Sequence, residues 1–340
     1  MSPGVSRSGV VVIAEIGVNH NGSLSLAKEL VVQAAEAGAD YAKFQTFSAQ
    51  DLASEAAPVA DYQKNASRAE RQVDLLSSLE LTDQHFEELV SFCASHQIGF
   101  LTTAHDLGSA EFVLRLRSDF IKVPSGDVTN FPFLRLVGQQ DKPVLLSTGA
   151  SAGEEVLRAI QVLEAEGLAR SKITVMQCTS EYPAPTGEAN LLAMVEMGRQ
   201  WGVPIGYSDH TLGYETAVAA VALGATVLEK HITLDREMEG PDHTASLEPE
   251  DFARMVSAVR SVEQALGTTV KVVTNAEAKN RNVIRKSIVA RLPISEGDAL
   301  TEENLAVMRP GTGLSPMDWL TVVGKVATRA YAPQEFIDGP

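Results

Sequence analysis

Two histidines lie at matching positions after consecutive β-branched segments, and a pair of this kind can bind a metal ion. His210 follows "PIGYSD" and His231 follows "TVLEK". Because side chains alternate between the two faces of a strand, the histidines share a face with Ser208 and Glu229. Two neutral imidazoles with open positions for water and substrate suit Mn²⁺, with Mg²⁺ or Co²⁺ as alternatives. The competing interpretation is that each histidine makes only a structural hydrogen bond.

Two lysines in the sequence are candidates for binding an anion. Lys43 stands in "KFQTF" and Lys122 in "KVPSGD", each near serine or threonine hydroxyls. Ammonium groups supported by hydroxyl donors bind phosphate well. One lysine could instead form an imine with pyruvate, as in an aldolase, or both could simply form ion pairs. The number of hydroxyls favours anion binding.

Two carboxylates are candidates for proton transfer. Glu15 lies near the end of the first predicted strand and Asp127 follows the fourth, where they could act as acid and base or orient sugar hydroxyls. Alternatively, they pair with the lysines. The two cysteines, Cys93 and Cys178, are predicted to be core thiols without chemistry.

The elements that position these residues follow a regular alternation of strands and helices. Eight strands are predicted, at residues 10–17, 41–46, 99–104, 120–126, 143–149, 173–180, 204–210 and 226–233. Helical patterns separate them, and a last helix is expected from about 248 to 266. This α/β order predicts right-handed βαβ units that close into a (β/α)₈ TIM barrel. The open doubly wound sheet is the competing fold, but no G-x-G-x-x-G follows the first strand.

Polar residues gather at the carboxyl ends of the predicted strands, which is where (β/α)₈ barrels carry their active sites. In strand order they are Glu15; Lys43 and Gln45; Thr102, Thr103 and His105; Lys122, Ser125 and Asp127; Ser147 and Thr148; Thr179, Ser180 and Tyr182; Ser208 and His210; and Glu229 and His231. We therefore expect one site at that end of the barrel.

The pattern changes after Gly267, which indicates a second domain. We predict a barrel over residues 1–267, a linker over 268–285 and a small, mostly β domain over 286–340. "SEGD" and "RPGTG" in the last segment are turn signals. Such a short domain has little core of its own, so docking onto another surface is expected.

Bulk composition narrows the function classes. With 28 basic and 44 acidic residues the formal charge is −16, which argues against a nucleic-acid partner. The sequence shows neither a secretion signal nor a membrane-spanning segment, and two cysteines form no disulfide framework, so we expect a cytoplasmic protein.

Nearly the whole chain resembles the sialic acid synthase family, the bacterial N-acetylneuraminate synthases. The resemblance lies in "AEIGVNHNGS", "KFQTF", "KVPSGD", "LSTGA", "EYPAP", "GYSDHTLG", "LEKHITLD", "GPDHTASLEP" and "RPGTGLSP". It implies a barrel followed by an antifreeze-like (SAF, β-clip) domain, in a domain-swapped homodimer. It also implies condensation of phosphoenolpyruvate with N-acetylmannosamine to N-acetylneuraminate and phosphate, with C–O cleavage and a divalent metal, typically Mn²⁺.

The same resemblance assigns roles to individual residues. Phosphoenolpyruvate contacts are expected from Lys43, Thr103, Lys122, Ser125, Ser180 and Ser208. Acceptor-sugar contacts are expected from Glu15, Gln45, Tyr182 and Asp242, and Arg309 is expected to reach the partner's site. The metal is expected on His210 and His231, with Glu15 or Asp127 moving protons.

Departures from the family pattern leave the acceptor sugar open. Ala104 and His105 replace the usual Pro and Phe, Asp127 replaces Glu, and Ala150 replaces Met. A legionaminate synthase that uses a 2,4-diacetamido-trideoxyhexose is the closest alternative, and pseudaminate synthases match less well. A lysine-imine aldolase and a non-catalytic sugar-binding barrel are more distant alternatives.

Overall fold

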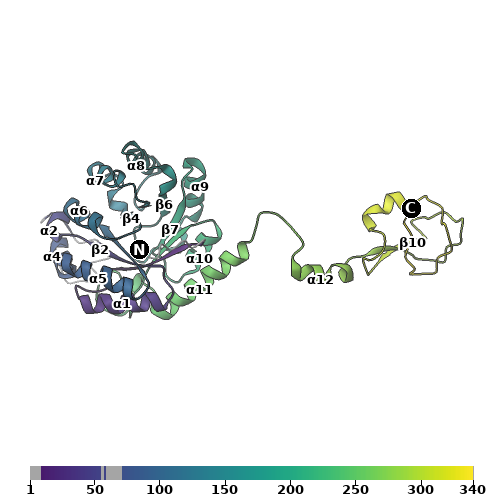
Figure 1. Cartoon of the computed structure of the whole chain (residues 1–340), viewed down its shortest axis with the longest axis horizontal. Helices are drawn as coiled ribbons and strands as arrows, with labels where there is room; N and C mark the ends of the chain where they lie inside the picture. The colour runs from purple at the N-terminus through teal and green to yellow at the C-terminus, as the bar shows by residue number, and fades with distance from the viewer. Residues whose placement is uncertain (1–8, 55–56, 59–70, 340) are drawn as a thin grey trace. The chain divides into compact units, whose positions relative to one another are not determined.

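A closed barrel of eight parallel strands occupies the unit that ends at Gly267 (Figure 1). The computed structural model describes residues 9–54, 57–58 and 71–339. The strands are β1 Val11–Gly17, β2 Tyr41–Thr46, β3 Gly99–Ala104, β4 Ile121–Val123, β5 Val144–Ser147, β6 Ile173–Gln177, β7 Ile205–Asp209 and β8 Val227–His231. Consecutive strands are neighbours and β8 pairs with β1, which confirms the predicted (β/α)₈ barrel.

Helices surround the strands (Figure 1). They are α1 Leu24–Glu36, α2 Ala49–Leu52, α4 Gln72–Leu79, α5 Asp83–Ser95, α6 Leu107–Arg115, α7 Phe131–Gly138, α8 Gly153–Ala165, α9 Leu191–Trp201, α10 Glu215–Ala222 and α11 Pro249–Leu266. Several begin at side-chain caps: Ser23 accepts from Leu26 N, and Asp106 accepts from Ser109 N. These caps pair backbone N–H groups that the first helical turn leaves free.

The alternation of side chains divides the strand residues into two sets. The outward set packs with the helices in the main core, as Phe44 and Val175 do. The inward set fills the barrel near the amino ends of its strands with a separate apolar cluster of Ile13, Tyr41, Leu101, Leu145, Met176 and Val227. Two residues further along each of these strands, the inward positions become polar. The barrel interior is therefore apolar near its amino end and polar at its carboxyl end.

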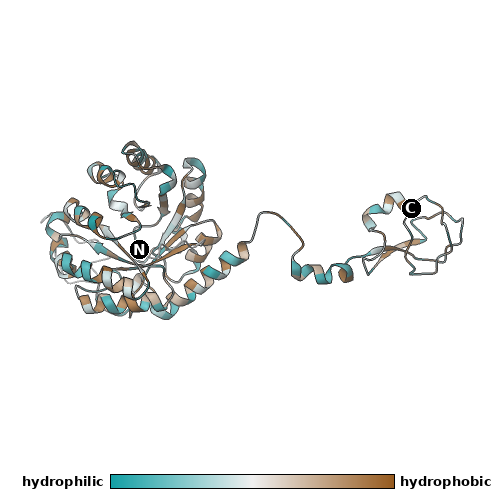
Figure 2. Ribbon diagram, viewed as in Figure 1, coloured by the Kyte–Doolittle hydropathy of each residue, from teal (hydrophilic) through white to brown (hydrophobic). Residues whose placement is uncertain are grey.

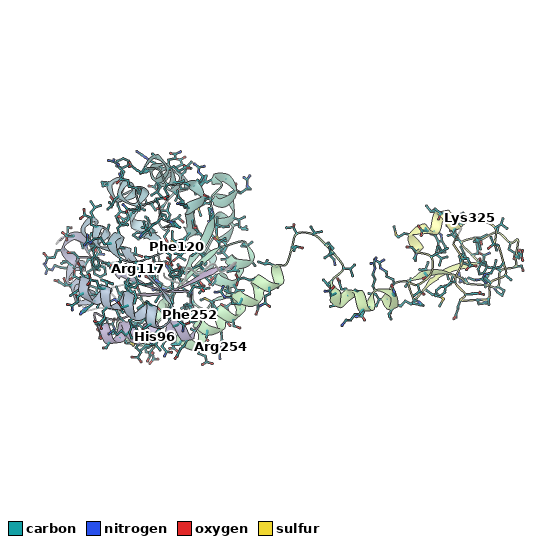
Figure 3. The ribbon with its side chains drawn as sticks, viewed as in Figure 1. His96, Arg117, Phe120, Phe252, Arg254 and Lys325 are labelled. Atoms are coloured by element: carbon teal, nitrogen blue, oxygen red, sulfur yellow. The ribbon has the colours of Figure 1, made fainter. Side chains whose placement is uncertain are left out.

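The helices present their apolar sides to the strands. In Figure 3, Phe252 of α11 lies toward the barrel and Arg254 lies at the outer surface. Phe252 is fully buried, whereas the Arg254 side chain is 59% exposed. Figure 2 shows the same division as apolar residues along the strands and polar residues on the outer helix surfaces. This pattern is typical of helices that cover a sheet.

An ion pair connects α11 to the amino end of the barrel. Asp40 precedes β2, and its Oδ2 accepts from Val12 N at 2.8 Å and from Arg260 Nη2 at 2.7 Å. Arg260 Nη1 also donates to Val10 O at 2.6 Å. The last helix of the barrel is thereby attached to its first strand, at the end opposite the polar interior.

Several strands end earlier than the sequence predicts. The segment expected at 120–126 is a strand only over Ile121–Val123, and Ser125–Asp127 forms a turn of 3₁₀ helix. Pro124 lacks a backbone N–H, so it cannot extend the ladder as a donor. The chain beyond such strand ends forms the loops around the polar end of the barrel.

The second unit covers residues from Thr268 onward and has its own core. Strands β9 Ser287–Ala290 and β10 Leu305–Met308 pair antiparallel, and α13 spans Trp319–Val322. Helix α12, Asn275–Ile284, lies inside the segment that we predicted to be a linker. A capping box between Thr274 and Glu277 starts this helix. The helix is not predicted from the sequence because its residues form no apolar face that would pack on a core. None of the described helices meets the length and hydropathy needed to cross a membrane.

Phe44→Ala should destabilise the barrel strongly. The Phe44 ring is fully buried, stacks on Phe100 with centroids 5.7 Å apart and meets Phe86 edge-on. Its removal leaves a cavity and should lower the free energy of unfolding by about 3–5 kcal/mol, measured by urea denaturation. The matched variant Phe131→Ala removes a ring that is 55% exposed and should cost less than about 1 kcal/mol. Equal losses in the two variants would contradict this account of the core.

Candidate active site

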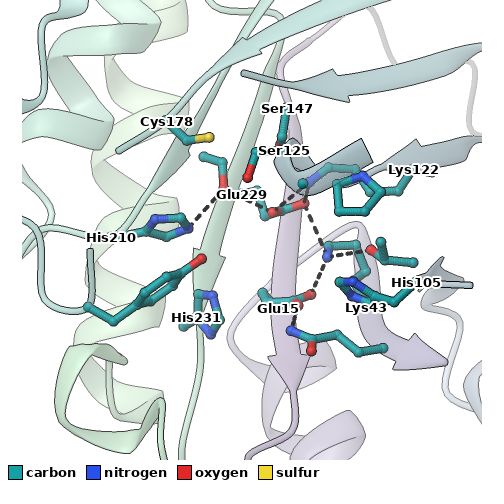
Figure 4. A pocket seen from close by; sticks show the side chains of 16 residues that line it. Glu15, Lys43, His105, Lys122, Ser125, Ser147, Cys178, His210, Glu229 and His231 are labelled. Atoms are coloured by element: carbon teal, nitrogen blue, oxygen red, sulfur yellow. Dashed lines mark hydrogen bonds and ion pairs between the residues drawn. The ribbon is translucent and has the colours of Figure 1, made fainter. Parts of the chain in front are cut away.

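One pocket lies at the carboxyl ends of the barrel strands, and its lining comes from every strand or the residues just after it (Figure 4). The lining residues are Glu15, Lys43, Gln45, Thr103, His105, Lys122, Pro124, Ser125, Gly126, Ser147, Cys178, Tyr182, Ser208, His210, Glu229 and His231. Most of the polar residues that the sequence placed at this end therefore share one cavity, whereas Thr102, Asp127, Thr148, Thr179 and Ser180 do not line it.

Four charged side chains form a lysine–glutamate cluster at the base of this pocket: Glu15, Lys43, Lys122 and Glu229. Lys122 Nζ donates to both carboxylate oxygens of Glu229, at 2.9 and 3.0 Å. Lys43 Nζ lies 2.7 Å from Glu15 Oε2 and 3.6 Å from Glu229 Oε2. Figure 4 shows Glu229 between the two lysines. Two ammonium groups thus converge on one carboxylate, an arrangement that an anionic ligand can also use.

Hydroxyl groups complete the surroundings of this cluster. Thr103 Oγ1 accepts from Lys43 Nζ at 3.0 Å, and Ser208 Oγ donates to Glu229 Oε1 at 2.9 Å. Ser125 and Ser180 lie nearby, with their hydroxyl oxygens 3.3 Å apart. These hydroxyls are donors of the kind that support a bound phosphate or carboxylate.

Burial and pairing act in opposite directions on the charges of the cluster. Burial alone would raise the pKa of Glu229, but Lys122 and Lys43 outweigh it and hold that pKa well below its usual range. Burial likewise opposes the charge of Lys43, yet Glu15 and Glu229 raise its pKa. For Glu15 burial prevails over Lys43, and its pKa is raised. Burial also lowers the pKa of Lys122, against the effect of Glu229.

The two predicted metal-ligating histidines are neighbours in the pocket; we call them the histidine pair. The ring centroids of His210 and His231 are 5.5 Å apart, and the Tyr182 ring lies 4.1 Å from that of His210. Burial lowers the pKa of His210 to about 4, and burial also lowers the pKa of His231 well below its usual value. Both imidazoles are therefore neutral at pH 7, which is the form that binds metals.

Hydrogen bonds orient the first imidazole. His210 Nδ1 lies 2.6 Å from Thr179 O, and a carbonyl oxygen only accepts, so Nδ1 carries the proton. His210 Nε2 is left with a lone pair, 3.3 Å from Ser208 Oγ on the pocket side. For His231, Nδ1 is buried without a hydrogen-bond partner among the described residues and lies 3.7 Å from Asp242 Oδ2.

The predicted acceptor-sugar residues lie near Glu15 or near the histidine pair. Gln45 Nε2 donates to Glu15 Oε1 at 3.2 Å, and Tyr182 covers the histidine pair. Asp242, in the loop after β8, is buried beside His231, and burial raises its pKa to about 7. The loop after β1 connects to this segment, because Asn19 Nδ2 donates to Ser246 Oγ at 2.8 Å.

Four predicted site residues lie outside the pocket lining: Ser180 and Asp242, described above, and Asp127 and Arg309. Asp127 belongs to the turn after β4, where its Oδ1 accepts from Asn130 Nδ2 at 2.7 Å, and burial raises its pKa. Arg309 belongs to the second unit, where its Nε donates to Ile284 O at 3.1 Å. These assignments stay predictions.

Comparisons with known proteins agree with this geometry. Residues 30–271 match the NeuB family, and residues 285–338 match the SAF domain. The chain belongs to the NeuB family. It is an enzyme of this synthase family, with the SAF domain that the sequence resemblance implied.

Three relatives show how the NeuB-family chain compares in detail. It is 42% identical to the N,N'-diacetyllegionaminic acid synthase of Campylobacter jejuni, covering 96% of this chain and 98% of the relative. It is 36% identical to human N-acetylneuraminate-9-phosphate synthase, covering 92% of this chain and 87% of the relative. The crystal structure of a sialic acid synthetase from Leptospira borgpetersenii, with citrate, matches with a TM-score of 0.72 at 29% identity, covering 80% of this chain and 90% of that one.

Six pocket residues of this NeuB-family chain were given no individual role from the sequence: His105, Pro124, Gly126, Ser147, Cys178 and Glu229. Glu229 was visible as the inward neighbour of His231, but only the structure shows that both lysines point at it. Cys178 was expected to be a core thiol. It is buried, yet it lines the pocket and its Sγ accepts from Gly149 N at 3.1 Å.

The donor set of the histidine pair fits a divalent ion with few protein ligands. The described residues contain no group of three or more His, Cys, Asp or Glu side chains arranged to hold a metal. The pair does offer neutral nitrogens, and Thr179 O holds one ring in a fixed tautomer. With only two protein ligands, most coordination positions would belong to water and substrate, as in a catalytic rather than a structural site.

Glu229→Ala should destabilise the fold and make the stability of the protein depend on bound anions. Without this carboxylate, two buried ammoniums share Glu15 alone, and the free energy of unfolding should fall by about 3–5 kcal/mol. Inorganic phosphate should raise the melting temperature of the variant more than that of the wild type, because the anion replaces the carboxylate. The control Glu250→Ala removes a carboxylate that is 81% exposed and should change little. A Glu229→Ala protein as stable as the wild type would refute the predicted role.

Proposed function

We propose that this enzyme condenses phosphoenolpyruvate with the open-chain form of an N-acetylated hexosamine, forming a nonulosonic acid and phosphate with C–O cleavage. The observation that supports it is the presence, in one pocket, of two buried lysines beside a pair of neutral histidines. Phosphoenolpyruvate carries a phosphate and a carboxylate, which suit two ammoniums and their hydroxyl donors.

The acceptor that we favour is a 2,4-diacetamido-trideoxyhexose, which would yield a legionaminate. Support comes from N,N'-diacetyllegionaminic acid synthases of two organisms, at 42% and 40% identity over 96% and 92% of the chain. N-acetylmannosamine, the acceptor first predicted from the sequence, is the second candidate. It is supported by the 36% identity to a synthase named for N-acetylneuraminate-9-phosphate.

Each group in the pocket has a task in this reaction. Lys43 and Lys122 hold the phosphate and carboxylate of phosphoenolpyruvate, and Thr103, Ser125 and Ser208 donate hydrogen bonds to them. Carbon 3 of phosphoenolpyruvate attacks the sugar aldehyde carbon, water adds to carbon 2, and phosphate leaves with the bridging oxygen. Glu15, whose pKa is raised by burial, supplies or accepts a proton at the sugar oxygen.

The histidine pair would hold the divalent ion, for which Mn²⁺ is the first candidate. When bound there, the ion polarises the aldehyde oxygen as a Lewis acid. Thr179 O keeps His210 Nε2 unprotonated toward the pocket, and Tyr182 limits the access of water to the pair. The homodimer and the role of Arg309 in the partner's site stay predictions.

Phosphate release should depend on both substrates. We expect the diacetamido sugar to give the higher kcat/KM, N-acetylmannosamine a lower one, and phosphoenolpyruvate alone almost no phosphate. With phosphoenolpyruvate labelled by ¹⁸O at the bridging position, mass spectrometry should find the label in phosphate. Label retained in the sugar acid, or borohydride trapping of pyruvate on Lys122, would contradict the proposed mechanism.

His210→Ala and His231→Ala should each abolish tight Mn²⁺ binding to the metal-stripped protein, measured by isothermal titration calorimetry. Phosphate release should fall at least about 100-fold, because Lewis-acid activation contributes several kcal/mol. His96→Ala, on the exposed end of α5, is the matched control and should behave like the wild type. Wild-type Mn²⁺ affinity in both active-site variants would exclude the histidine pair as the metal site.

A further inference from the structure

Between the inward-facing residues of β7 and β8 lies a second pair of charges that the pocket does not use. Asp209 stands between Ser208 and His210, and Lys230 stands between Glu229 and His231. Because side chains alternate along a strand, Asp209 and Lys230 face the helix layer while their neighbours line the pocket. We call them the outer ion pair.

The outer ion pair is buried and joins the two strands at one level. Asp209 and Lys230 are register partners, their side chains are fully buried, and Lys230 Nζ lies 2.9 Å from Asp209 Oδ2. An unpaired charge at such a place costs several kcal/mol, so sliding one strand relative to the other would be penalised. The pair therefore fixes the relative height of β7 and β8 one residue before each histidine.

The outer ion pair also holds the backbone that follows His210. Asp209 Oδ1 accepts from Thr211 N at 2.9 Å and from Thr211 Oγ1 at 2.8 Å. Lys230 Nζ donates to Thr211 O, and Thr216 Oγ1 of α10 donates to Asp209 Oδ2 at 3.0 Å. The residues on both sides of His210 are thus bound to one side-chain cluster.

An apolar pair of similar volume would not perform this task. Replacing a buried ion pair by apolar residues is often neutral or stabilising for a fold, so fold stability alone does not require the charges. What apolar side chains lack is the ability to bind the N–H and C=O of Thr211 simultaneously. The bond from Lys230 Nζ to Thr211 O connects the loop carrying His210 to the strand carrying His231, and the bond from Thr211 N to Asp209 fixes that loop on β7.

We infer that Asp209 and Lys230 are positioning residues that set the separation and orientation of the histidine pair for the divalent ion. This inference rests on the proposed function of that pair. The positioning role also accounts for the repeated sequence pattern, in which the acidic Asp209 precedes His210 and the basic Lys230 precedes His231. In this proposal His210 and His231 bind the ion, and Asp209 and Lys230 fix the positions of these two histidines.

The test compares Mn²⁺ affinity in the full-length, metal-stripped protein. The double variant Asp209→Asn/Lys230→Met removes both charges together, so neither is left buried alone, and the introduced amide oxygen can still accept from Thr211 N. We expect its Mn²⁺ dissociation constant to rise about 10–100-fold, as for other residues that orient metal ligands. At saturating Mn²⁺ its kcat should remain reduced, while the KM for phosphoenolpyruvate stays within about twofold of the wild type.

Two further variants separate positioning from general stability. Asp40→Asn weakens the acid–base pair with Arg260 at the amino end of the barrel, so it should lower the melting temperature but leave Mn²⁺ affinity unchanged. Thr216→Val removes one donor to Asp209 without removing a charge, and should raise the dissociation constant by a smaller factor. It serves as the test if the double variant does not fold.

The outcomes distinguish the inference from the proposed function. Wild-type Mn²⁺ affinity in the folded double variant, or an equal loss in Asp40→Asn, would overturn the positioning role while leaving the proposed function intact. If the double variant does not fold, wild-type Mn²⁺ affinity in Thr216→Val overturns the positioning role instead. A wild-type protein that binds no Mn²⁺ and releases no phosphate would remove the proposed function itself, and the inference with it.

Discussion

Charge neutralisation inside the barrel is the constraint on which the site depends. Glu15, Lys43, Lys122 and Glu229 are only 2–4% exposed, and each would be costly to bury without a partner. The pair of Lys122 and Glu229 joins β4 to β8, which are not hydrogen-bonded neighbours in the barrel. The polar layer therefore connects opposite parts of the wall at one level, directly above the apolar layer.

This neutral cluster differs from a simple positive pocket. Two lysines balance two carboxylates, so an incoming anion must compete with Glu229 for the ammoniums instead of entering an empty positive site. Burial has already raised the pKa of Glu15, so this carboxyl can take up a proton when a ligand adds negative charge. One proton taken up by Glu15 would offset one unit of the negative charge that an anionic ligand brings into the cluster.

The sequence predicted the fold and most of the pocket because both follow from periodicity. Strand alternation and the eight repeats were enough to place Lys43, Lys122 and His231 at one end of the barrel. Pairing across the interior was less predictable, since nothing in the local pattern around Glu229 indicates that a lysine 107 residues away points at it. For Asp127, strand alternation did not predict the direction of the side chain, because a turn after β4 directs its carboxylate to Asn130 instead of the pocket.

Recognition of the acceptor must involve residues other than the clusters that carry the chemistry. In the proposed reaction the lysines would bind phosphate and carboxylate and the histidine pair would face the aldehyde, so these residues would contact groups that every candidate sugar or phosphoenolpyruvate shares. They cannot distinguish an acetamido group from a hydroxyl at carbon 4. That difference would have to be detected by the pocket wall, which includes His105. A buried polar group that loses its partner discriminates more strongly than an apolar wall, so the wall, and not the reaction centre, carries the choice of sugar.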